Sequence, residues 1–226
     1  MADKKKIVLV GGHGKIALLA APKLVEAGYA VDSLIRNPDH RDDVAAAGAN
    51  PVLLDVESAD TDALADAFGS AEAIVFAAGA GGGNPARTKA VDQEAAIRTM
   101  DAAAQAGVSR YVIISYFRSA ADIHSLDKDS SFYPYAEAKH RADEYLTDTE
   151  LDYTILGPGG LTEEPASGRI IVADAEGAVD DDSHEGVDTS RENVAEVIRH
   201  VLISGAGKRQ RINFFDGDTP IDEAIR

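Results

Sequence analysis

Tyr135 and Lys139 stand four residues apart in the segment PYAEAKHRADEYL. At that spacing a helix presents both side chains on one face, so the phenol and the ammonium can approach each other. A tyrosine hydroxyl can serve as a general acid or base, and its pKa, about 10 in isolation, falls where a cation favours the phenolate. We therefore expect a catalytic pair in which Tyr135 exchanges the proton and Lys139 lowers its pKa.

A second hydroxyl near this pair would help to polarise a substrate carbonyl. Ser115 ends the apolar run 110–115, and Tyr116 follows it. Neighbouring side chains of an extended strand point to opposite faces, so only one of the two can face the Tyr135 hydroxyl. We favour Ser115 as the catalytic donor, with Tyr116 packing away or lining the wall. Tyr116 as the donor stays an open alternative.

A glycine-rich turn lies between the apolar run 7–10 and a helical stretch that begins at Lys15. Gly11 permits a sharp turn, and Gly14 lets the backbone approach a pyrophosphate. The helix behind the turn offers free N–H groups and a positive dipole end to phosphate oxygens. The spacing GxxGxxA differs from GxGxxG and lacks the GK[ST] ending of a P-loop. This context favours cofactor binding by Gly11, Gly12, His13, Gly14, Lys15 and Ile16.

The residues that follow the second predicted strand suggest which dinucleotide binds. NAD-selective proteins place an acid at this strand end to bind the ribose hydroxyls, whereas this chain has Arg36, followed by Asn37. A guanidinium there suits a 2′-phosphate, and His40 and Arg41 add positive charge nearby. We therefore predict NADP as the cofactor, with NAD still possible.

Two further strand ends carry residues suited to the rest of a dinucleotide. Asp55 can accept from the adenine amino group while Val56 lies along the ring, although Asp55 can equally begin a helix. Small residues after the fourth strand let a dinucleotide cross the sheet edge. They are Ala77, Ala78 and Gly79.

The elements that must position these residues alternate between short apolar runs and helical stretches, which is typical of βαβ units and a parallel sheet. The expected strands are 7–10, 30–35, 51–54, 73–78, 110–115 and 152–156, and the expected helices are 15–27, 42–47, 60–68, 86–106 and 135–146. The prediction is an α/β fold, a Rossmann-type doubly wound parallel sheet with helices on both faces.

The alternation loosens after Leu156. We expect a loop at 157–160, a short strand at 169–173, an acidic segment at 179–187, a helix at 193–203 and a last strand at 211–215. The chain is therefore predicted to form a single domain, 1–226, with a small irregular C-terminal substrate region. The substrate-side segments are expected mainly in 116–134 and 157–190.

Composition excludes several classes of function. The chain has 226 residues, no cysteine, and 39 acidic against 22 basic residues, a formal charge of -17. Disulfides and thiol catalysis are excluded, and a polyanion such as DNA or an acidic membrane would be repelled. The six histidines show no metal-like spacing, and Asp180, Asp181, Asp182 and Glu185 are expected to form a solvated loop rather than a cation site.

The apolar run behind the basic start is far shorter than the roughly 7–15 residues of a signal peptide. We therefore expect a cytoplasmic protein with a small-molecule substrate, as a monomer or a homodimer.

The motifs GGHGKIA, LIRNP, LLDV, FAAG, YVIIS, PYAEAKHRADEYL and LDYTILGPGGLT together resemble those of the atypical short-chain dehydrogenase/reductases. The chain is most similar to their small NAD(P)H-binding, NmrA-like and biliverdin-reductase-B-like bacterial members, from about residue 6 to 222. The resemblance implies a Rossmann fold, with the nicotinamide near Pro158 and Gly159. One departure is that the family's serine or threonine position looks closer to Tyr116 than to Ser115.

Three functions fit these observations. The first is an NADP(H)-dependent oxidoreductase that acts on a small carbonyl, quinone or flavin-like substrate. The second is a non-catalytic NADP-binding sensor or regulatory protein, which the displaced serine favours and the Tyr135–Lys139 pair opposes. The third is an epimerase or dehydratase acting on a nucleotide sugar, although only 87 residues follow Lys139 to form a substrate domain.

Overall fold

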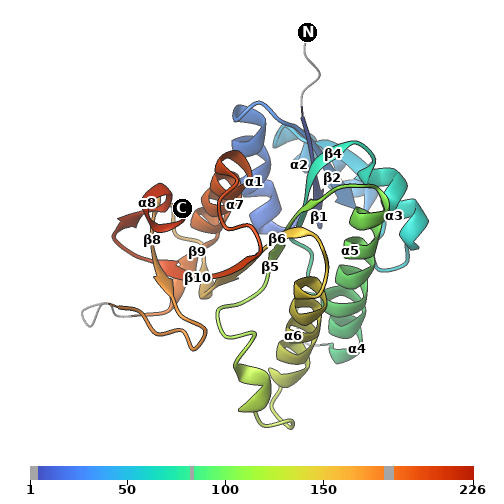
Figure 1. Ribbon diagram of the computed structural model, residues 1–226. Coiled ribbons are helices and arrows are strands. Elements are labelled where there is room, and N and C mark those ends of the chain that lie inside the picture. Colours follow the sequence, from blue (N-terminus) through green and yellow to red (C-terminus); the bar gives the residue numbers. More distant parts are fainter. Residues whose placement is uncertain (1–4, 82–83, 181–185) are drawn as a thin grey trace.

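A nine-stranded sheet runs through the centre of the computed structural model, which describes residues 5–81, 84–180 and 186–226 (Figure 1). Its strands, in spatial order, are β11 (Thr219–Pro220), β8 (Arg169–Ala173), β10 (Gln210–Asp216), β6 (Asp152–Pro158), β5 (Arg110–Ile114), β4 (Ala71–Phe76), β1 (Lys6–Val10), β2 (Ala30–Ile35) and β3 (Asn50–Leu53). Every neighbouring pair from β10 to β3 is parallel, whereas β8 pairs antiparallel with β10 and β11. The strand order reverses between β1 and β4, because β2 and β3 lie on one side of β1 and β4 lies on the other.

Helices cover both faces of this sheet, which confirms the predicted doubly wound architecture. Figure 1 shows α1 (Lys15–Glu26) and α7 (Arg191–Ser204) side by side, and α3 (Thr61–Phe68), α5 (Ala96–Gln105) and α6 (Tyr133–Thr147) in the other half of the molecule. The remaining helices are α2 (Arg41–Ala46), α4 (Pro85–Thr88), α8 (Ile221–Ala224) and the short 3₁₀ turns η1 (Pro38–His40) and η3 (Asp122–His124). No helix in the described ranges is long and apolar enough to cross a membrane.

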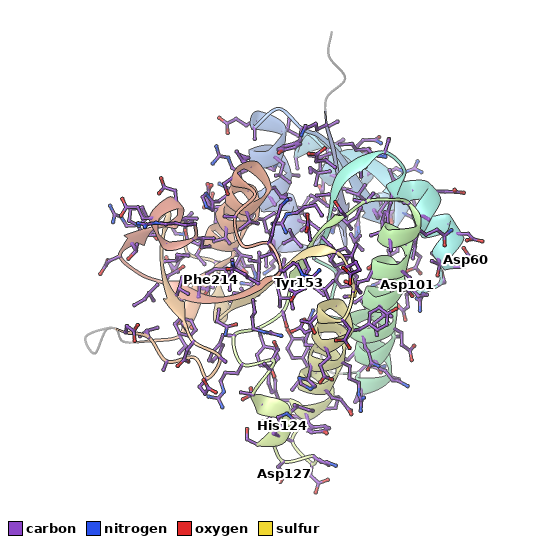
Figure 2. The ribbon with its side chains drawn as sticks, in the orientation of Figure 1. Asp60, Asp101, His124, Asp127, Tyr153 and Phe214 are labelled. Carbon is purple, nitrogen blue, oxygen red and sulfur yellow. The ribbon has the colours of Figure 1, made fainter. Side chains whose placement is uncertain are left out.

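The apolar runs of the sequence become strands because both of their faces are buried. In β1, Ile7 and Leu9 belong to the core under α1 and α7, whereas Val8 and Val10 belong to the core under α3, α5 and α6. Successive strand residues face opposite sides, so a continuous apolar run fills two cores at once. In Figure 2 Phe214, a buried residue of β10, lies within the fold, whereas the exposed Asp60 and Asp127 lie at the periphery.

The predicted elements are present with bounds that differ by at most two residues, and two regions differ more. The helix expected over 86–106 is interrupted by a π-helix, η2 (Lys89–Ala95), between α4 and α5. The loop expected at 157–160 is wrong, because β6 continues to Pro158 and β7 (Gly160–Thr162) follows. The acidic residues Asp181, Asp182 and Glu185 lie outside the described residues.

The C-terminal third is more regular than predicted. β6 continues because β10 pairs with it through Asn213 and Phe214, a long-range contact that local sequence does not reveal. β9 (Asp188–Ser190) pairs in parallel with β7 to form a second, two-stranded sheet. These added strands lie beyond the carboxyl end of β6, where β7 follows β6 and pairs with β9.

Candidate functional site

Two cavities meet at the carboxyl ends of β1 and β4, where the strand order reverses. The first, of about 220 Å³, is bounded by the glycine turn and by the ends of β2 and β3. The second, of about 620 Å³, is bounded by α6 and the loop after β4. Both are lined by Ala77, Ala78 and Gly79. Ligands of open parallel sheets bind at such a switch point, so the joined cavities form the candidate site.

The glycine turn is closely packed against the neighbouring strands. Gly11 has φ +81°, and a Cβ there would lie 2.6 Å from the Cα of Ala78. A Cβ on Gly12 would lie 2.4 Å from the Cβ of Ser33. Gly14 begins α1 without a side-chain cap, and the described first turn of α1 carries no acidic group. The N–H groups at this helix end are therefore available to an anion.

The residues predicted to bind the pyrophosphate separate into two sets. Gly11, His13 and Gly14 line the first cavity, and Ile16 lines the second. Gly12 packs on β2, and the Lys15 ammonium lies 2.7 Å from the Glu163 carboxylate at the surface. Neither Gly12 nor Lys15 is among the described residues of the two cavity walls.

Charged and ionisable side chains of both signs gather at the end of the first cavity beside β2 and β3. Arg36, His40, Asp55 and Val56 all line it, as predicted from their places after the strands. Asn37 does not line it, because its side chain accepts a hydrogen bond from the Asp39 N–H at 3.0 Å and so begins η1. The rings of His13 and His40 stack at 3.6 Å between centroids.

Sequence reasoning missed two charged residues at this end. Glu57 lines the first cavity, and its carboxylate lies 3.7 Å from the Arg36 guanidinium and 3.4 Å from that of Arg87. Arg87 arrives from α4 and also donates to the carbonyl of Ala80 at 2.7 Å. No local pattern in the sequence indicates that α4 would reach the end of β2.

The Tyr135–Lys139 pair lies on the wall of the second cavity, one helical turn apart on α6. The Lys139 ammonium is 5.9 Å from the centre of the Tyr135 ring and donates to the Ile114 carbonyl at 2.9 Å. It also lies 3.2 Å from the Asp92 carboxylate, and both side chains are almost fully buried. A buried ammonium needs such partners because leaving it unpaired costs several kcal/mol, roughly.

Asp92 is a further site residue that sequence reasoning missed. It lies in the π-helix η2, and it lines the second cavity. Its second carboxylate oxygen accepts a hydrogen bond from the Ala80 N–H at 3.0 Å. π-turns often occur at functional sites, but the sequence 86–106 has the periodicity of an ordinary helix. Asp92 thereby links Lys139 to the loop after β4.

The pKa of Tyr135 is shifted in the direction opposite to the prediction. Burial raises it, Lys139 lowers it, and the carboxylates of Asp92 and Asp143 raise it, so that it lies above the usual value of about 10. Burial lowers the pKa of Lys139, but Tyr135, Asp92 and Asp143 outweigh burial and raise it. The expectation that Lys139 makes Tyr135 more acidic overlooked the loss of water around the phenol.

Of the two candidate donors, Ser115 lines the second cavity, while Tyr116 is absent from its described walls. The Tyr116 ring packs 5.6 Å from the Tyr135 ring and 5.4 Å from the Phe132 ring, and burial raises the pKa of its hydroxyl. The Ser115 hydroxyl donates to the Asp143 carboxylate at 2.7 Å.

The segment expected near the nicotinamide contributes a different residue to the walls. Among the described residues, Leu161 lines the second cavity, whereas Pro158 and Gly159 line neither. The Gly159 N–H donates to the Phe214 carbonyl and to the Thr189 hydroxyl. A Cβ on Gly159 would lie 1.8 Å from the carbonyl oxygen of Val187, so this glycine is enclosed by protein.

A doubly wound sheet, an uncapped helix N-terminus behind a glycine turn, and joined cavities at the switch point define a dinucleotide-binding Rossmann protein. Two arginines line the cavity at one end of this site, and a buried Tyr–Lys pair lines the cavity at the other end. The chain belongs to the NAD(P)H-binding family, which it matches over residues 11–204. Family membership indicates a nicotinamide cofactor, and it confirms the resemblance to atypical short-chain dehydrogenase/reductases.

Similar proteins span nearly the whole chain. The Schizosaccharomyces pombe protein named UPF0659 protein C216.03 is 33% identical over 96% of this chain and 92% of its own length. The Bacillus subtilis protein named uncharacterized sugar epimerase YhfK is 31% identical over 98% of this chain and 99% of its own. The solved structure of the oxidoreductase ylbE from Lactococcus lactis has a TM-score of 0.82 and 29% identity, covering 97% of this chain and 94% of that one.

Proposed function

We propose that this protein is an NADP(H)-dependent oxidoreductase that reduces a small carbonyl, quinone or flavin-like substrate in the second cavity. The observation that carries the proposal is the buried Tyr135–Lys139 pair on the wall of a cavity that joins the first one across Ala77, Ala78 and Gly79. A ligand lying across that edge from Arg36 would end beside the pair. The similarity to the Lactococcus oxidoreductase supports the same class.

The direction of proton transfer follows from the raised pKa of Tyr135. Its phenol keeps the proton at neutral pH, so it can give that proton to a substrate oxygen. A bound reduced nicotinamide would supply the hydride. Two of the three Lys139 donors are directed to Ile114 and Asp92, and the third is left for a ribose hydroxyl. At neutral pH Tyr135 is therefore ready to donate a proton, which is the role that reduction of a carbonyl requires.

The choice of NADP over NAD rests on the charges of the first cavity. Arg36, Arg87 and His40 line it, and a 2′-phosphate is a strong partner for a guanidinium. The Glu57 carboxylate lies 3.7 Å from the Arg36 guanidinium and 3.4 Å from that of Arg87. An NAD-selective site would instead use a carboxylate for the ribose hydroxyls, and Glu57 makes that the competing arrangement.

The decisive experiment follows NADPH oxidation with a panel of aldehydes, ketones, quinones and flavins. We expect Tyr135→Phe to keep NADPH binding and to lower turnover by roughly 10²–10⁴-fold, because the proton donor is lost. Tyr133→Phe is the matched control, since Tyr133 lies on the same helix but faces an outer groove with Pro85 and Arg141. Unchanged turnover in Tyr135→Phe would mean that the proton comes from solvent.

The name of the Bacillus relative favours a second candidate, an epimerase acting on a nucleotide sugar. Such a protein would interconvert two sugar nucleotides without net consumption of cofactor. Incubation with nucleotide-sugar pairs and chromatography of the products tests it. NADPH binding without turnover of either panel would support instead the sensor or regulatory function.

A further inference from the structure

A buried hydrogen-bond network lies directly behind the second cavity. The Asp143 carboxylate accepts from Ser115 at 2.7 Å, from Ser119 at 2.7 Å and from the Arg211 guanidinium at 2.9 Å, all at the same oxygen. Asp143 and Ser119 are fully buried, and Ser115 is 3% exposed. The four residues come from the ends of β5 and β10, from α6 and from the loop after β5, so the network exists only in the folded chain.

This network determines which way the Ser115 proton points. A carboxylate paired with a guanidinium can only accept hydrogen bonds, so a hydroxyl beside it must donate. Ser115 has a single hydroxyl proton, and it is directed to Asp143. A hydroxyl oxygen that has donated its proton keeps two lone pairs, and no other residue in the described ranges donates to this one.

Toward the cavity, the Ser115 oxygen can therefore only accept a hydrogen bond. Ser115 shares that cavity wall with Tyr135, whose phenol is a donor. Resting on the proposed reductase function, we propose that the preferred substrate carries an O–H or N–H group beside its reducible carbonyl, and that Ser115 accepts a hydrogen bond from it. Asp143 and Arg211 act as positioning residues that hold Ser115 in this orientation.

The opening of the same cavity is lined by apolar side chains that suit an aromatic group on the substrate. Phe132 and Leu161 line the cavity and are 41% and 38% exposed. Phe132 packs against Tyr116 and Tyr135 with ring centres 5.4 Å apart in each case. Aromatic rings pack favourably at such distances, so an aryl group has suitable neighbours here. An aryl ketone with an adjacent hydroxyl combines both features.

The reduction of such a ketone balances with the groups named. With a reduced nicotinamide bound, the carbonyl carbon would gain a C–H bond and two electrons as hydride, and the carbonyl π-bond would break. The carbonyl oxygen takes the proton of Tyr135, which regains one from solvent. The adjacent hydroxyl keeps its proton and shares it with Ser115, so it binds without reacting.

Two probes that differ in the hydrogen-bond donor and by one methyl group test this assignment, and the Ser115→Ala variant below separates the two differences. They are 2-hydroxy-1-phenylethanone and its methyl ether, 2-methoxy-1-phenylethanone, each assayed for kcat/KM with NADPH. We expect the unmodified protein to favour the hydroxy compound by about tenfold or more, because the ether cannot donate to Ser115. Equal rates, or a preference for the ether, would overturn the proposal.

Substitutions in the network show whether Ser115 carries the preference. Ser115→Ala should bring the ratio of the two kcat/KM values close to one. Ser119→Ala is the matched control, since Ser119 donates to the same oxygen but lies outside the described walls of the cavity, and it should keep the ratio. A preference that survives in Ser115→Ala, or disappears in Ser119→Ala alone, would contradict the assignment.

The role of Asp143 is tested through the ratio of the two kcat/KM values, which reports the orientation of the Ser115 hydroxyl, rather than through loss of activity. Asp143→Asn should keep the preference, because Arg211 can only donate and the amide oxygen will take the shared position. Asp143→Ala frees the Ser115 proton to turn into the cavity, so the ratio should fall to one or invert. A folded Asp143→Ala protein, checked by circular dichroism, that keeps the preference would show that Asp143 does not orient Ser115.

A binding measurement separates this proposal from the reductase assignment. The protein is saturated with tetrahydro-NADP, a reduced analogue that does not transfer hydride, and each probe is titrated by calorimetry. We expect the hydroxy compound to bind at least about tenfold more tightly than the ether. Tighter binding of the hydroxy compound without any turnover would refute the reductase function but not the role of Ser115. Equal affinities of the two compounds would refute the role of Ser115.

Discussion

Arg36 is half-exposed at the end of the first cavity, where it shares the Glu57 carboxylate with Arg87. We predict that Arg36→Ala weakens NADPH binding about tenfold or more and leaves NADH binding nearly unchanged. The reason is the loss of a charge-assisted hydrogen bond to the 2′-phosphate, on the order of 1.5–3 kcal/mol. Fluorescence titration with both cofactors measures the effect.

Arg87→Ala should act in the same direction, since Arg87 lines the same cavity. Arg41→Ala is the control, because Arg41 is exposed on α2 and is not among the described wall residues. Equal weakening of NADPH and NADH by Arg36→Ala would assign Arg36 to a part of the cofactor that both share.

The raised pKa of Tyr135 predicts how the reaction depends on pH. The phenol remains protonated from about pH 6 to 9, so kcat/KM for reduction should be flat over that range and fall only above about pH 10. A pH–rate profile with NADPH and a turned-over carbonyl checks this. A fall centred between about pH 7 and 8 would show that Lys139 lowers the pKa of Tyr135 by more than burial raises it.

The same shift has a consequence for stability. Above about pH 10 the tyrosine of the unfolded chain loses its proton while the folded one keeps it, so the unfolded state binds fewer protons. The free energy of unfolding therefore falls as pH rises beyond that value, and the raised pKa of Lys139 acts in the same direction. Tyr135→Phe should reduce this alkaline slope in urea titrations.

Among the elements, the turn between β1 and α1 has the least room for change. Gly11 has φ +81° and lies against the backbone of Ala78, whereas Gly107 has φ +73° with nothing within 4 Å of an added Cβ. Gly107→Ala should cost about 1–2 kcal/mol for the left-handed backbone alone. Gly11→Ala should cost a further 1–3 kcal/mol, roughly, because the segment that follows β4 at Ala78 must move.

Urea unfolding of the two variants measures this difference. Gly107 is the matched control because it shares the backbone conformation and lacks the neighbour. Equal losses would show that the segment around Ala78 moves away from the added methyl group without cost. In that case the close approach of the turn to Ala78 would not limit which residues the turn accepts.

For the whole molecule, the formal charge of -17 acts against compactness. We predict that Tm rises by a few degrees between about 20 mM and 0.5 M KCl, because salt shortens the range of the self-repulsion from about 20 Å to below 5 Å. Differential scanning calorimetry measures it. A triple variant with amides at Asp218, Asp222 and Glu223, all exposed, should show a smaller rise. A falling Tm would mean that screening of favourable ion pairs dominates.

Local rules were sufficient for much of this protein. Apolar runs between turn residues predicted the parallel strands, and the glycine turn predicted the end of the sheet at which the cavities lie. The spacing of Tyr135 and Lys139 predicted a shared face of α6. Each of these features depends on backbone conformation or on periodicity within a few residues, which the sequence carries by itself.

The tertiary structure decided what surrounds those residues. It brought Arg87 and Glu57 to Arg36, it placed Asp92 beside Lys139 through a π-turn, and it turned the Ser115 proton toward Asp143. It also reversed the expected pKa shift of Tyr135, because desolvation depends on everything packed around a group. Such contacts join segments that are distant in the chain, so no local pattern specifies them.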